Sequence, residues 1–230
     1  MYTAIMIMAK VPQAGEVKTR LCPPLSPQEA MALYSAFLRD KIAQVQSLEA
    51  ASPTIAYTPS DGRNIFAALA PDFTLIAQQG ADLGERLANA VAQCFAAGHT
   101  GVIAIDSDTP TLPTNFLQQA IALLAMPNVD VVIGPSDDGG YYLIGLRALH
   151  HELFENMAWS TDAVVPETVR RATAKGLQIA WLPPWFDVDT PEDLERLQST
   201  LKYTPGKAPW HTRQFFLEHT SFLSLKRLEH

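Results

Sequence analysis

The chain has 230 residues, of which 47% are hydrophobic, so it is too apolar for a disordered protein and long enough for one large domain. Its net charge of -7 argues against general nucleic-acid binding, and no apolar run reaches the roughly 18 residues that a membrane helix needs. The two cysteines, Cys22 and Cys94, exclude a disulfide framework and a cysteine-rich zinc site. We therefore expect a cytoplasmic protein with reduced thiols, and neither nucleic acid nor a membrane as a partner.

Short apolar runs alternate with longer amphipathic segments along the chain. The predicted strands are 3–8, 54–57, 74–77, 101–105, 129–134, 142–146 and 178–182. Helices are predicted from Ser26 to about residue 46, from Asp82, over 112–125 and 166–175, and from Thr190; Ser26, Asp82 and Thr190 provide helix-start signals. This alternation predicts an α/β fold with three layers, in which helices cover both faces of a mostly parallel sheet.

The composition changes near residue 203, where proline and glycine indicate a linker. We expect one main domain over 1–202, followed by a linker and helical tail over 203–227. The tail carries aromatic and leucine side chains, namely Trp210, Phe215, Phe216, Phe222 and Leu225. Two arrangements stay open: the tail docks on its own chain, or it packs on a second copy to form a homodimer. Residues 228–230 resemble the remnant of an expression tag and carry no functional argument.

The loop after the first strand gathers positive charge in an otherwise acidic protein. Its polar residues and the backbone around Ala9 and Gly15 suit phosphate oxygens, and the residues concerned are Ala9, Lys10, Gly15, Lys18, Thr19 and Arg20. The spacing is not that of a Walker A loop. The alternative is a solvated surface loop without a ligand.

Two Asp-x-Asp pairs each follow a predicted strand. Asp106 and Asp108 come after the strand 101–105, and Asp187 and Asp189 come after the last strand. Two such carboxylates can hold Mg²⁺ or Mn²⁺ together with substrate phosphates. The alternative is that each pair only caps a turn or helix, because short acidic segments commonly do so.

Three further segments offer polar or aromatic side chains. The segment 136–142 contains Asp138, Gly139, Gly140 and Tyr141, which suit either a ligand site or a simple hairpin turn. Arg86 follows a predicted helix start and is a candidate nucleotide contact. The last segment gives an aromatic surface with two hydroxyls for an acceptor: Trp159, Ser160 and Thr161.

The order of these motifs resembles a bacterial glycosyltransferase-like family found beside radical-SAM and selenoprotein-type genes. The motifs are 8–20, 80–86, 107–110, 138–141 and 187–194. The family is similar in turn to the molybdenum-cofactor and phospholactate nucleotidyltransferases. The resemblance covers about residues 2–200 and implies a glycosyltransferase A-type, nucleotide-diphospho-sugar transferase-like fold.

The resemblance also implies a divalent metal, with Asp108 as the dependable ligand and Asp106 as the weaker one. It implies that Lys10, Lys18 and Arg20 contact nucleotide phosphates.

The main hypothesis is therefore a metal-dependent glycosyltransferase that uses a nucleotide-diphosphate sugar and a small-molecule acceptor. In it Asp108 and Asp189 hold Mg²⁺ or Mn²⁺, Lys18 and Arg20 stabilise the leaving group, and Asp138 activates or orients the acceptor. The first alternative is a nucleotidyltransferase that joins a nucleoside triphosphate to a phosphorylated acceptor. The second is a nucleotide-binding regulatory protein without turnover.

Overall fold

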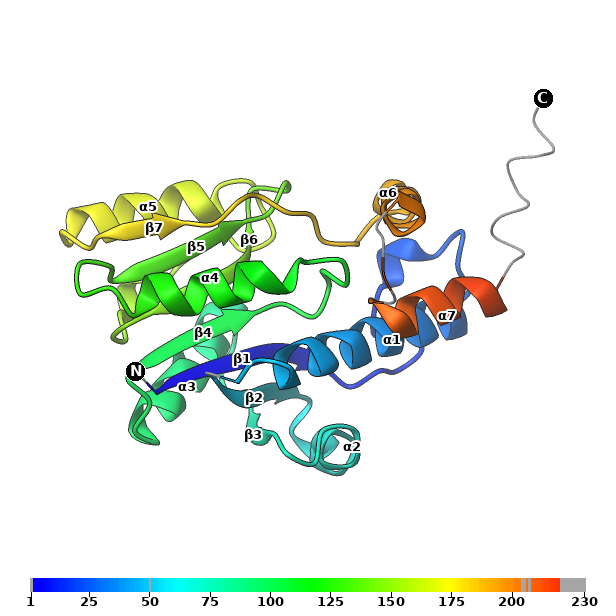
Figure 1. The fold of residues 1–230 in the computed structure, drawn as a ribbon, viewed down its shortest axis with the longest axis horizontal. Coiled ribbons are helices and arrows are strands. Elements are labelled where there is room, and N and C mark those ends of the chain that lie inside the picture. The colour runs from blue at the N-terminus through cyan, green and yellow to red at the C-terminus, as the bar shows by residue number, and fades with distance from the viewer. Residues whose placement is uncertain (1, 50, 204–205, 207, 220–230) are drawn as a thin grey trace.

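The computed structural model describes residues 2–49, 51–203, 206 and 208–219. Its seven-stranded sheet has the order β3-β2-β1-β4-β6-β5-β7 (Figure 1). The strands are β1 (Thr3–Lys10), β2 (Ala51–Thr58), β3 (Thr74–Ala77), β4 (Gly101–Ile105), β5 (Val131–Pro135), β6 (Tyr141–Leu146) and β7 (Ile179–Trp181). Each predicted strand is present, and the mostly parallel sheet is confirmed.

Strand β6 runs against the direction of the other strands. It pairs antiparallel with both β4 and β5, whereas β1 pairs parallel with β2 and β4. Because of this reversal, β6 starts at the edge of the sheet where β1 and β4 end. The loop after β1, the acidic turn after β4 and the segment before β6 therefore meet at one edge, which is where open α/β sheets bind ligands.

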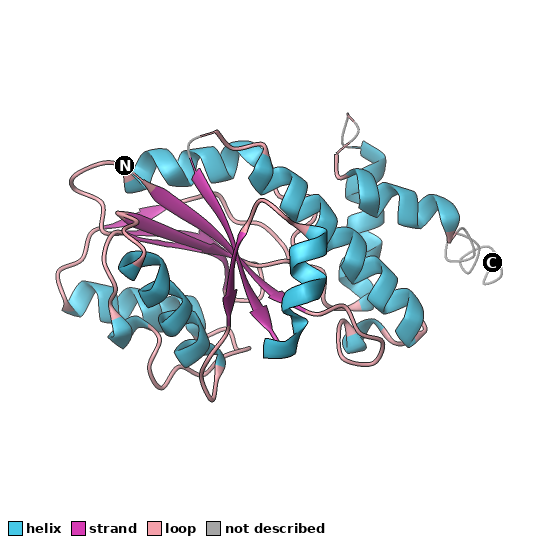
Figure 2. Cartoon of the chain, turned by 90° about the horizontal axis from the view of Figure 1, so that it is seen from below, coloured by secondary structure: helices cyan, strands magenta, loops and turns pink. Residues whose placement is uncertain are grey.

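Helices cover both faces of the sheet (Figure 2). One face packs against α1 (Pro27–Gln46), α2 (Arg63–Leu69) and α4 (Thr114–Leu124), and the other packs against α3 (Leu83–Ala96) and α5 (Val164–Ala174). The predicted three-layer α/β/α arrangement is confirmed.

The predicted helix-start signals at Ser26, Asp82 and Thr190 each make cap hydrogen bonds. At α1, the Ser26 amide donates to the Glu29 carboxylate at 2.8 Å, and the Glu29 amide donates back to the Ser26 hydroxyl. At α3, the Asp82 carboxylate accepts from the Glu85 amide at 2.9 Å. These bonds satisfy backbone groups that a helix end leaves open.

Helix α7 (Trp210–Glu218) docks on α1 of the same chain, alongside α6 (Pro191–Tyr203) (Figure 1). Phe215 and Phe216 are buried in this contact. The Asp40 carboxylate, on α1, accepts hydrogen bonds from the backbone amides of His211 and Thr212 at 2.9 and 2.7 Å. The start of α7 is thus fixed by a charge-assisted bond from another helix.

This docking agrees with the first of the two arrangements expected for the tail, while a homodimer stays a prediction. Phe222, Leu225 and residues 228–230 lie outside the described residues. Within the described part of the chain, no helix has both the length and the apolar composition to cross a bilayer.

Candidate active site

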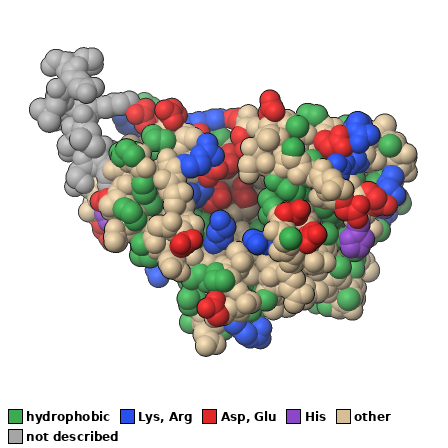
Figure 3. Space-filling view, turned by 180° about the vertical axis from the view of Figure 1, so that it is seen from behind, with side chains coloured by type: hydrophobic (Ala, Val, Ile, Leu, Met, Phe, Trp, Pro, Cys, Tyr) green, Lys and Arg blue, Asp and Glu red, His purple; other side chains and the backbone are tan. Residues whose placement is uncertain are grey.

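A cavity of about 430 Å³ opens at the edge of the sheet where β1 and β4 end. Figure 3 shows a hollow in this face of the molecule, with acidic side chains at its floor and Lys and Arg side chains around it. Its charged lining comes from four separate segments: Lys10, Glu16, Lys18, Arg20, Arg86, Asp106, Asp108 and Asp189. The fold therefore brings the predicted basic loop and both acidic pairs to one site.

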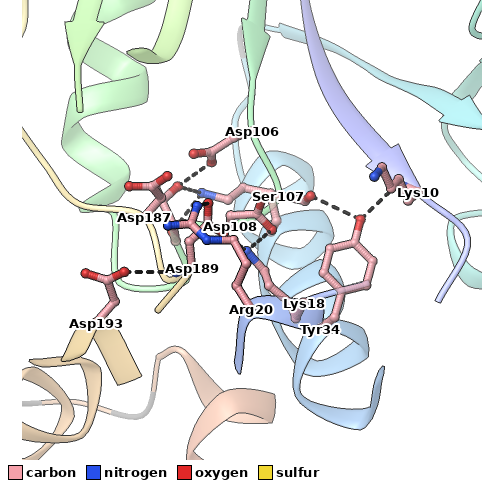
Figure 4. Close-up of polar contacts among 12 residues, drawn as sticks. Lys10, Lys18, Arg20, Tyr34, Asp106, Ser107, Asp108, Asp187, Asp189 and Asp193 are labelled. Carbon is pink, nitrogen blue, oxygen red and sulfur yellow. Dashed lines mark hydrogen bonds and ion pairs between the residues drawn. The ribbon is translucent and has the colours of Figure 1, made fainter. Parts of the chain in front are cut away.

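Lys18 joins the two acidic segments (Figure 4). Its Nζ lies 2.8 Å from Asp108 Oδ1 and 2.7 Å from Asp189 Oδ1, and only 5% of its side chain is exposed. Burial disfavours the charged ammonium, but the two carboxylates outweigh that effect and raise the pKa of Lys18 above its ordinary value. Lys18 is therefore a charged, buried link between the two acidic segments, and it lies 171 positions before Asp189 in the sequence.

The backbone at Lys18 is left-handed, with φ 50° and ψ 36°. This region is uncommon for a residue with a side chain and costs about 1–2 kcal/mol. Three hydrogen-bonded residues, 19–21, follow it as a short helical turn. The turn places Arg20 on the same side of the cavity, with a guanidinium nitrogen 3.7 Å from Asp189 Oδ2.

The first aspartate of each acidic pair is bound to a hydroxyl rather than to Lys18. Thr109 Oγ1 donates to Asp106 at 2.6 Å, and Ser136 Oγ donates to Asp187 at 2.9 Å. Burial raises the pKa of Asp106 above its ordinary value, and burial together with nearby carboxylates raises the pKa of Asp187 to about 6.

The helix cap after the second pair uses other residues. Thr190 Oγ1 accepts from the Asp193 amide, and the Asp193 carboxylate accepts from the Thr190 amide at 2.8 Å. Thr190 and Asp193 therefore form the helix cap, and the side chains of Asp187 and Asp189 take no part in these two hydrogen bonds.

A buried lysine from α1 supports the turn after β4. Lys41 is 1% exposed, and its ammonium donates to the backbone oxygen and the hydroxyl of Thr109, at 3.0 and 2.9 Å. Burial lowers the pKa of Lys41, while Asp106, Asp108 and Asp40 oppose that shift. The Thr109 hydroxyl thus connects Lys41 to Asp106.

A second contact from α1 fixes the end of β1. The Lys10 amide donates to the Tyr34 hydroxyl at 2.9 Å, and that hydroxyl shares a 3.1 Å hydrogen bond with Ser107 (Figure 4). Burial and the Asp108 carboxylate raise the pKa of Tyr34 to about 12. The neutral phenol therefore ties the basic loop to the acidic turn.

One part of the cavity lining is aromatic and apolar. The rings of Tyr141 and Trp159 meet edge to face at 6.2 Å between centroids, and both line the cavity beside Leu83 of α3, which is 44% exposed. Within the described residues, the Tyr141 hydroxyl and the Trp159 indole nitrogen have no hydrogen-bond partner. This part offers a surface for a neutral group rather than for a phosphate.

Of the remaining predicted site residues, some line the cavity and others lie outside its lining. Ala9, Thr19 and Arg86 line the cavity, and Arg86 Nε also donates to the Gly80 carbonyl at 3.1 Å. The residues outside the lining are Gly15, Asp138, Gly139, Gly140, Ser160 and Thr161. Their proposed roles stay predictions.

The segment 136–140 forms the turn of the β5–β6 hairpin, the simpler of the two interpretations offered for its glycines. The Ser136 amide donates to the Gly140 carbonyl at 2.9 Å, and the Asp138 carboxylate accepts from the Gly140 amide. Gly139 has φ 89°, and a Cβ there would lie 2.3 Å from the Asp162 Cα. Local backbone demands therefore account for glycine at this position.

Four residues that sequence reasoning did not single out have defined contacts at the site: Tyr34, Lys41, Gln78 and Thr109. Gln78 lines the cavity and donates to the Ala56 carbonyl at 2.7 Å. Tyr34 and Lys41 lie inside a long amphipathic helix, where a sequence pattern indicates only which face is buried. The sequence pattern alone does not distinguish Tyr34 and Lys41 from ordinary helix residues.

A little over half of the chain, residues 41–161, matches the family model DUF2064, described as uncharacterized protein conserved in bacteria. A solved protein from Desulfovibrio desulfuricans G20, described as a candidate nucleotide-diphospho-sugar transferase, is 34% identical, with a TM-score of 0.89 and 97% of each chain covered. The chain belongs to the DUF2064 family. The predicted glycosyltransferase-like relationship is thus confirmed at the level of family and fold, and the association with radical-SAM and selenoprotein-type genes stays a prediction.

More distant solved structures share the fold of this DUF2064 protein. A cytidylyltransferase from Leptospira borgpetersenii serovar Hardjo-bovis is 14% identical over all of both chains, with a TM-score of 0.61. Glucosyl-3-phosphoglycerate synthase from Mycobacterium tuberculosis, solved with Mn²⁺ and UDP, is 12% identical with a TM-score of 0.52, covering 96% of this chain and 79% of that one. No curated protein matches the sequence. The predicted transferase fold is confirmed, since the proteins it resembles are transferases.

Proposed function

We propose that this protein transfers a sugar from a nucleotide-diphosphate sugar to a small acceptor, with the help of Mg²⁺ or Mn²⁺. The observation that supports this most is the convergence of Asp108 and Asp189 on one buried cation, the Lys18 ammonium, inside a cavity also lined by Lys10, Arg20 and Arg86. A diphosphate needs positive charge near both phosphates, and its departure with negative charge needs that charge to be neutralised.

The donor atoms at this position suit a hard divalent cation. Asp108 and Asp189 each present a carboxylate oxygen to the same nitrogen, so one small cation between them can contact both. Within the described ranges, no three His, Cys, Asp or Glu side chains gather as a metal site. Two protein carboxylates together with substrate phosphates are nonetheless a common ligand set for Mg²⁺. The metal, when bound, would supply Lewis-acid stabilisation of the leaving diphosphate.

The remaining charges of the cavity would bind and orient the donor. Arg20 is 69% exposed at the cavity and can offer its planar guanidinium to a phosphate in a bidentate contact. Lys10 adds a second positive charge at the end of β1, where the bond between its amide and Tyr34 fixes its backbone. Thr19 and the amides of the loop complete the proposed phosphate contacts.

The neutral part of the cavity would hold the acceptor. Tyr141 and Trp159 provide apolar ring surface, while the Tyr141 hydroxyl and the Trp159 indole nitrogen are buried and lack hydrogen-bond partners within the described residues. Asp138 is the proposed group that orients or deprotonates the acceptor hydroxyl. It lies in the β5–β6 turn outside the cavity lining, so the acceptor would have to extend toward that turn.

Thermal-shift measurement with a panel of nucleotide sugars and nucleoside triphosphates tests this function, each ligand with Mn²⁺, Mg²⁺ or a chelator. A bound ligand at one hundred times its Kd stabilises the protein by about 2.7 kcal/mol. We expect a metal-dependent rise in Tm with one nucleotide sugar in the wild type and none in Asp108→Asn. No shift with any nucleotide would contradict the proposal.

Nucleotidyl transfer is the second candidate. The cavity lining includes four cationic side chains, Lys10, Lys18, Arg20 and Arg86, which suits a triphosphate at least as well as a diphosphate. This activity would release pyrophosphate when a nucleoside triphosphate and a phosphorylated acceptor are supplied. A Tm shift with triphosphates alone, together with pyrophosphate release, would favour it over glycosyl transfer.

A further inference from the structure

Lys18 holds the position between the two carboxylates that the proposed function gives to a divalent metal. We propose that Lys18 is an exchangeable internal cation: it closes the Asp108–Asp189 site in the free protein and moves to the donor's phosphates when a divalent cation binds. This inference rests on the proposed function for its second half, the move to the phosphates. Its first half, competition for the carboxylates, rests on the geometry of the free protein.

Geometry argues that the ammonium and a metal ion exclude each other. Lys18 Nζ lies within 2.8 Å of an oxygen of each carboxylate, so it fills the space that both oxygens face. A Mg²⁺ ion bound by the same oxygens would lie about 2.0–2.1 Å from each. Two cations in that space would be in contact, and their repulsion at short range is large because little solvent reaches the Lys18 ammonium, whose side chain is 5% exposed.

Charge balance explains why a lysine is tolerated and needed there. Asp108 and Asp189 are half-buried, with 32% and 35% of their side chains exposed, and would repel one another without a cation between them. The Lys18 ammonium removes that repulsion when no ligand is present. A buried charge that is paired in this way is costly to strip of its partner, so Lys18 leaves only where a replacement cation arrives.

The position of Lys18 in the loop gives its ammonium a second destination. Lysine has a flexible four-carbon stem and no fixed geometry, unlike arginine. Lys18 lines the same cavity as Lys10 and Arg20, the side chains proposed to bind the diphosphate. A released ammonium can therefore pair with phosphate oxygens. Metal and nucleotide should then strengthen each other's binding. The metal releases the Lys18 ammonium for the phosphates, and the phosphates give the released ammonium a new partner.

The test is a titration of Mn²⁺ followed by electron paramagnetic resonance, without nucleotide, on the full chain and on Lys18→Met. Methionine keeps the length of the stem and removes the charge. We expect Lys18→Met to bind Mn²⁺ about tenfold or more tightly than the wild type, because the competing cation is gone. Lys10→Met is the matched control: it removes one positive charge from the same cavity and should change Mn²⁺ affinity far less.

A second variant guards against misfolding of Lys18→Met. Lys18→Gln keeps a hydrogen-bond donor for the carboxylates but carries no charge, and it should also bind Mn²⁺ more tightly than the wild type. Circular dichroism and Tm in the presence of Mn²⁺ establish that each variant is folded. Folded Lys18→Met and Lys18→Gln proteins that bind Mn²⁺ no more tightly than the wild type would overturn the proposal.

A calorimetric titration with UDP at saturating Mn²⁺, when the metal has displaced Lys18 from the carboxylates, tests the second half. We expect Lys18→Met to bind UDP more weakly than the wild type, opposite in sign to its effect on Mn²⁺. Unchanged UDP affinity in a protein whose Mn²⁺ affinity rises would overturn the move to the phosphates and leave the competition standing. If the wild type binds no nucleotide at all, the proposed function fails, and the Mn²⁺ titration still decides whether Lys18 competes for the carboxylates.

Discussion

The two acidic turns, one after β4 and one after β7, are built alike although they share no strand. In each, the second aspartate, Asp108 or Asp189, contacts the Lys18 ammonium. In each, the first aspartate accepts a hydrogen bond from a hydroxyl and has a raised pKa: Asp106 from Thr109, and Asp187 from Ser136.

This likeness indicates that the two aspartates of each Asp-x-Asp pair have different roles. The first carboxylate accepts a hydrogen bond from a neighbouring hydroxyl, and the second contacts the Lys18 ammonium. The two turns differ in their surroundings. Thr109 is also bound by the buried Lys41, whereas Asp189 has a second cation nearby in Arg20.

Removing the charge of either second aspartate should have the largest effect. We expect Asp108→Asn and Asp189→Asn to lower the rate of sugar transfer by at least about 100-fold, because the proposed metal loses a ligand. Asp106→Asn and Asp187→Asn keep an acceptor for the neighbouring hydroxyl and should lower the rate by less than about tenfold. The measurement is transfer from the donor that the thermal-shift panel identifies, with Tm as the check on folding. Equal losses in all four variants would remove the distinction between first and second aspartates.

The hydroxyls of Thr109 and Ser136 can each be removed, and the resulting loss in the free energy of unfolding compares the two turns. Thr109→Val leaves the Lys41 ammonium, which is buried, without one of its two acceptors, so it should destabilise the fold by about 1–3 kcal/mol. Ser136→Ala removes a single hydrogen bond from Asp187 and should cost about 1 kcal/mol. Urea unfolding of both variants measures the difference. A Ser136→Ala protein less stable than Thr109→Val would show that Lys41 does not distinguish the turns.

The smallest expected effect belongs to Arg20. Its side chain is 69% exposed and lies 3.7 Å from Asp189, so solvent screens the pair, and Arg20→Met should change the free energy of unfolding by about 0–1 kcal/mol. The same variant should bind the nucleotide more weakly if Arg20 contacts phosphate. Urea unfolding and calorimetry separate the two effects. A large loss of stability would mean that the Arg20 side chain, like that of Lys18, makes contacts that stabilise the folded protein.

Much of the fold could be predicted from sequence because its signals are local. Strands of a sheet covered on both faces are short apolar runs, and the helices at Ser26 and Asp82 begin with capping residues. Helix α2 was not predicted: it has seven residues, only Phe66 of them is buried, and no side chain caps its start. An element that short has no periodicity to detect.

Several residues of the candidate site could be predicted from the sequence, but the contacts between them could not. The sequence places Lys18, Asp108 and Asp189 after strands of one sheet, so their convergence at one edge follows from topology. That the Lys18 ammonium lies between the carboxylates depends on a left-handed residue in a loop, which no pattern announces. Lys41 gives no signal either, because its neighbours in α1 look like an ordinary amphipathic helix.

The span of the Lys18–Asp189 link has a consequence for the order in which the contacts of Lys18 form during synthesis. Lys18 emerges early from the ribosome, and its second carboxylate partner is made 171 residues later. Until then the ammonium can pair only with Asp108, and α6, which follows Asp189, cannot yet pack against α1. A polypeptide that stops before residue 189 therefore lacks one of the two carboxylates that contact the Lys18 ammonium.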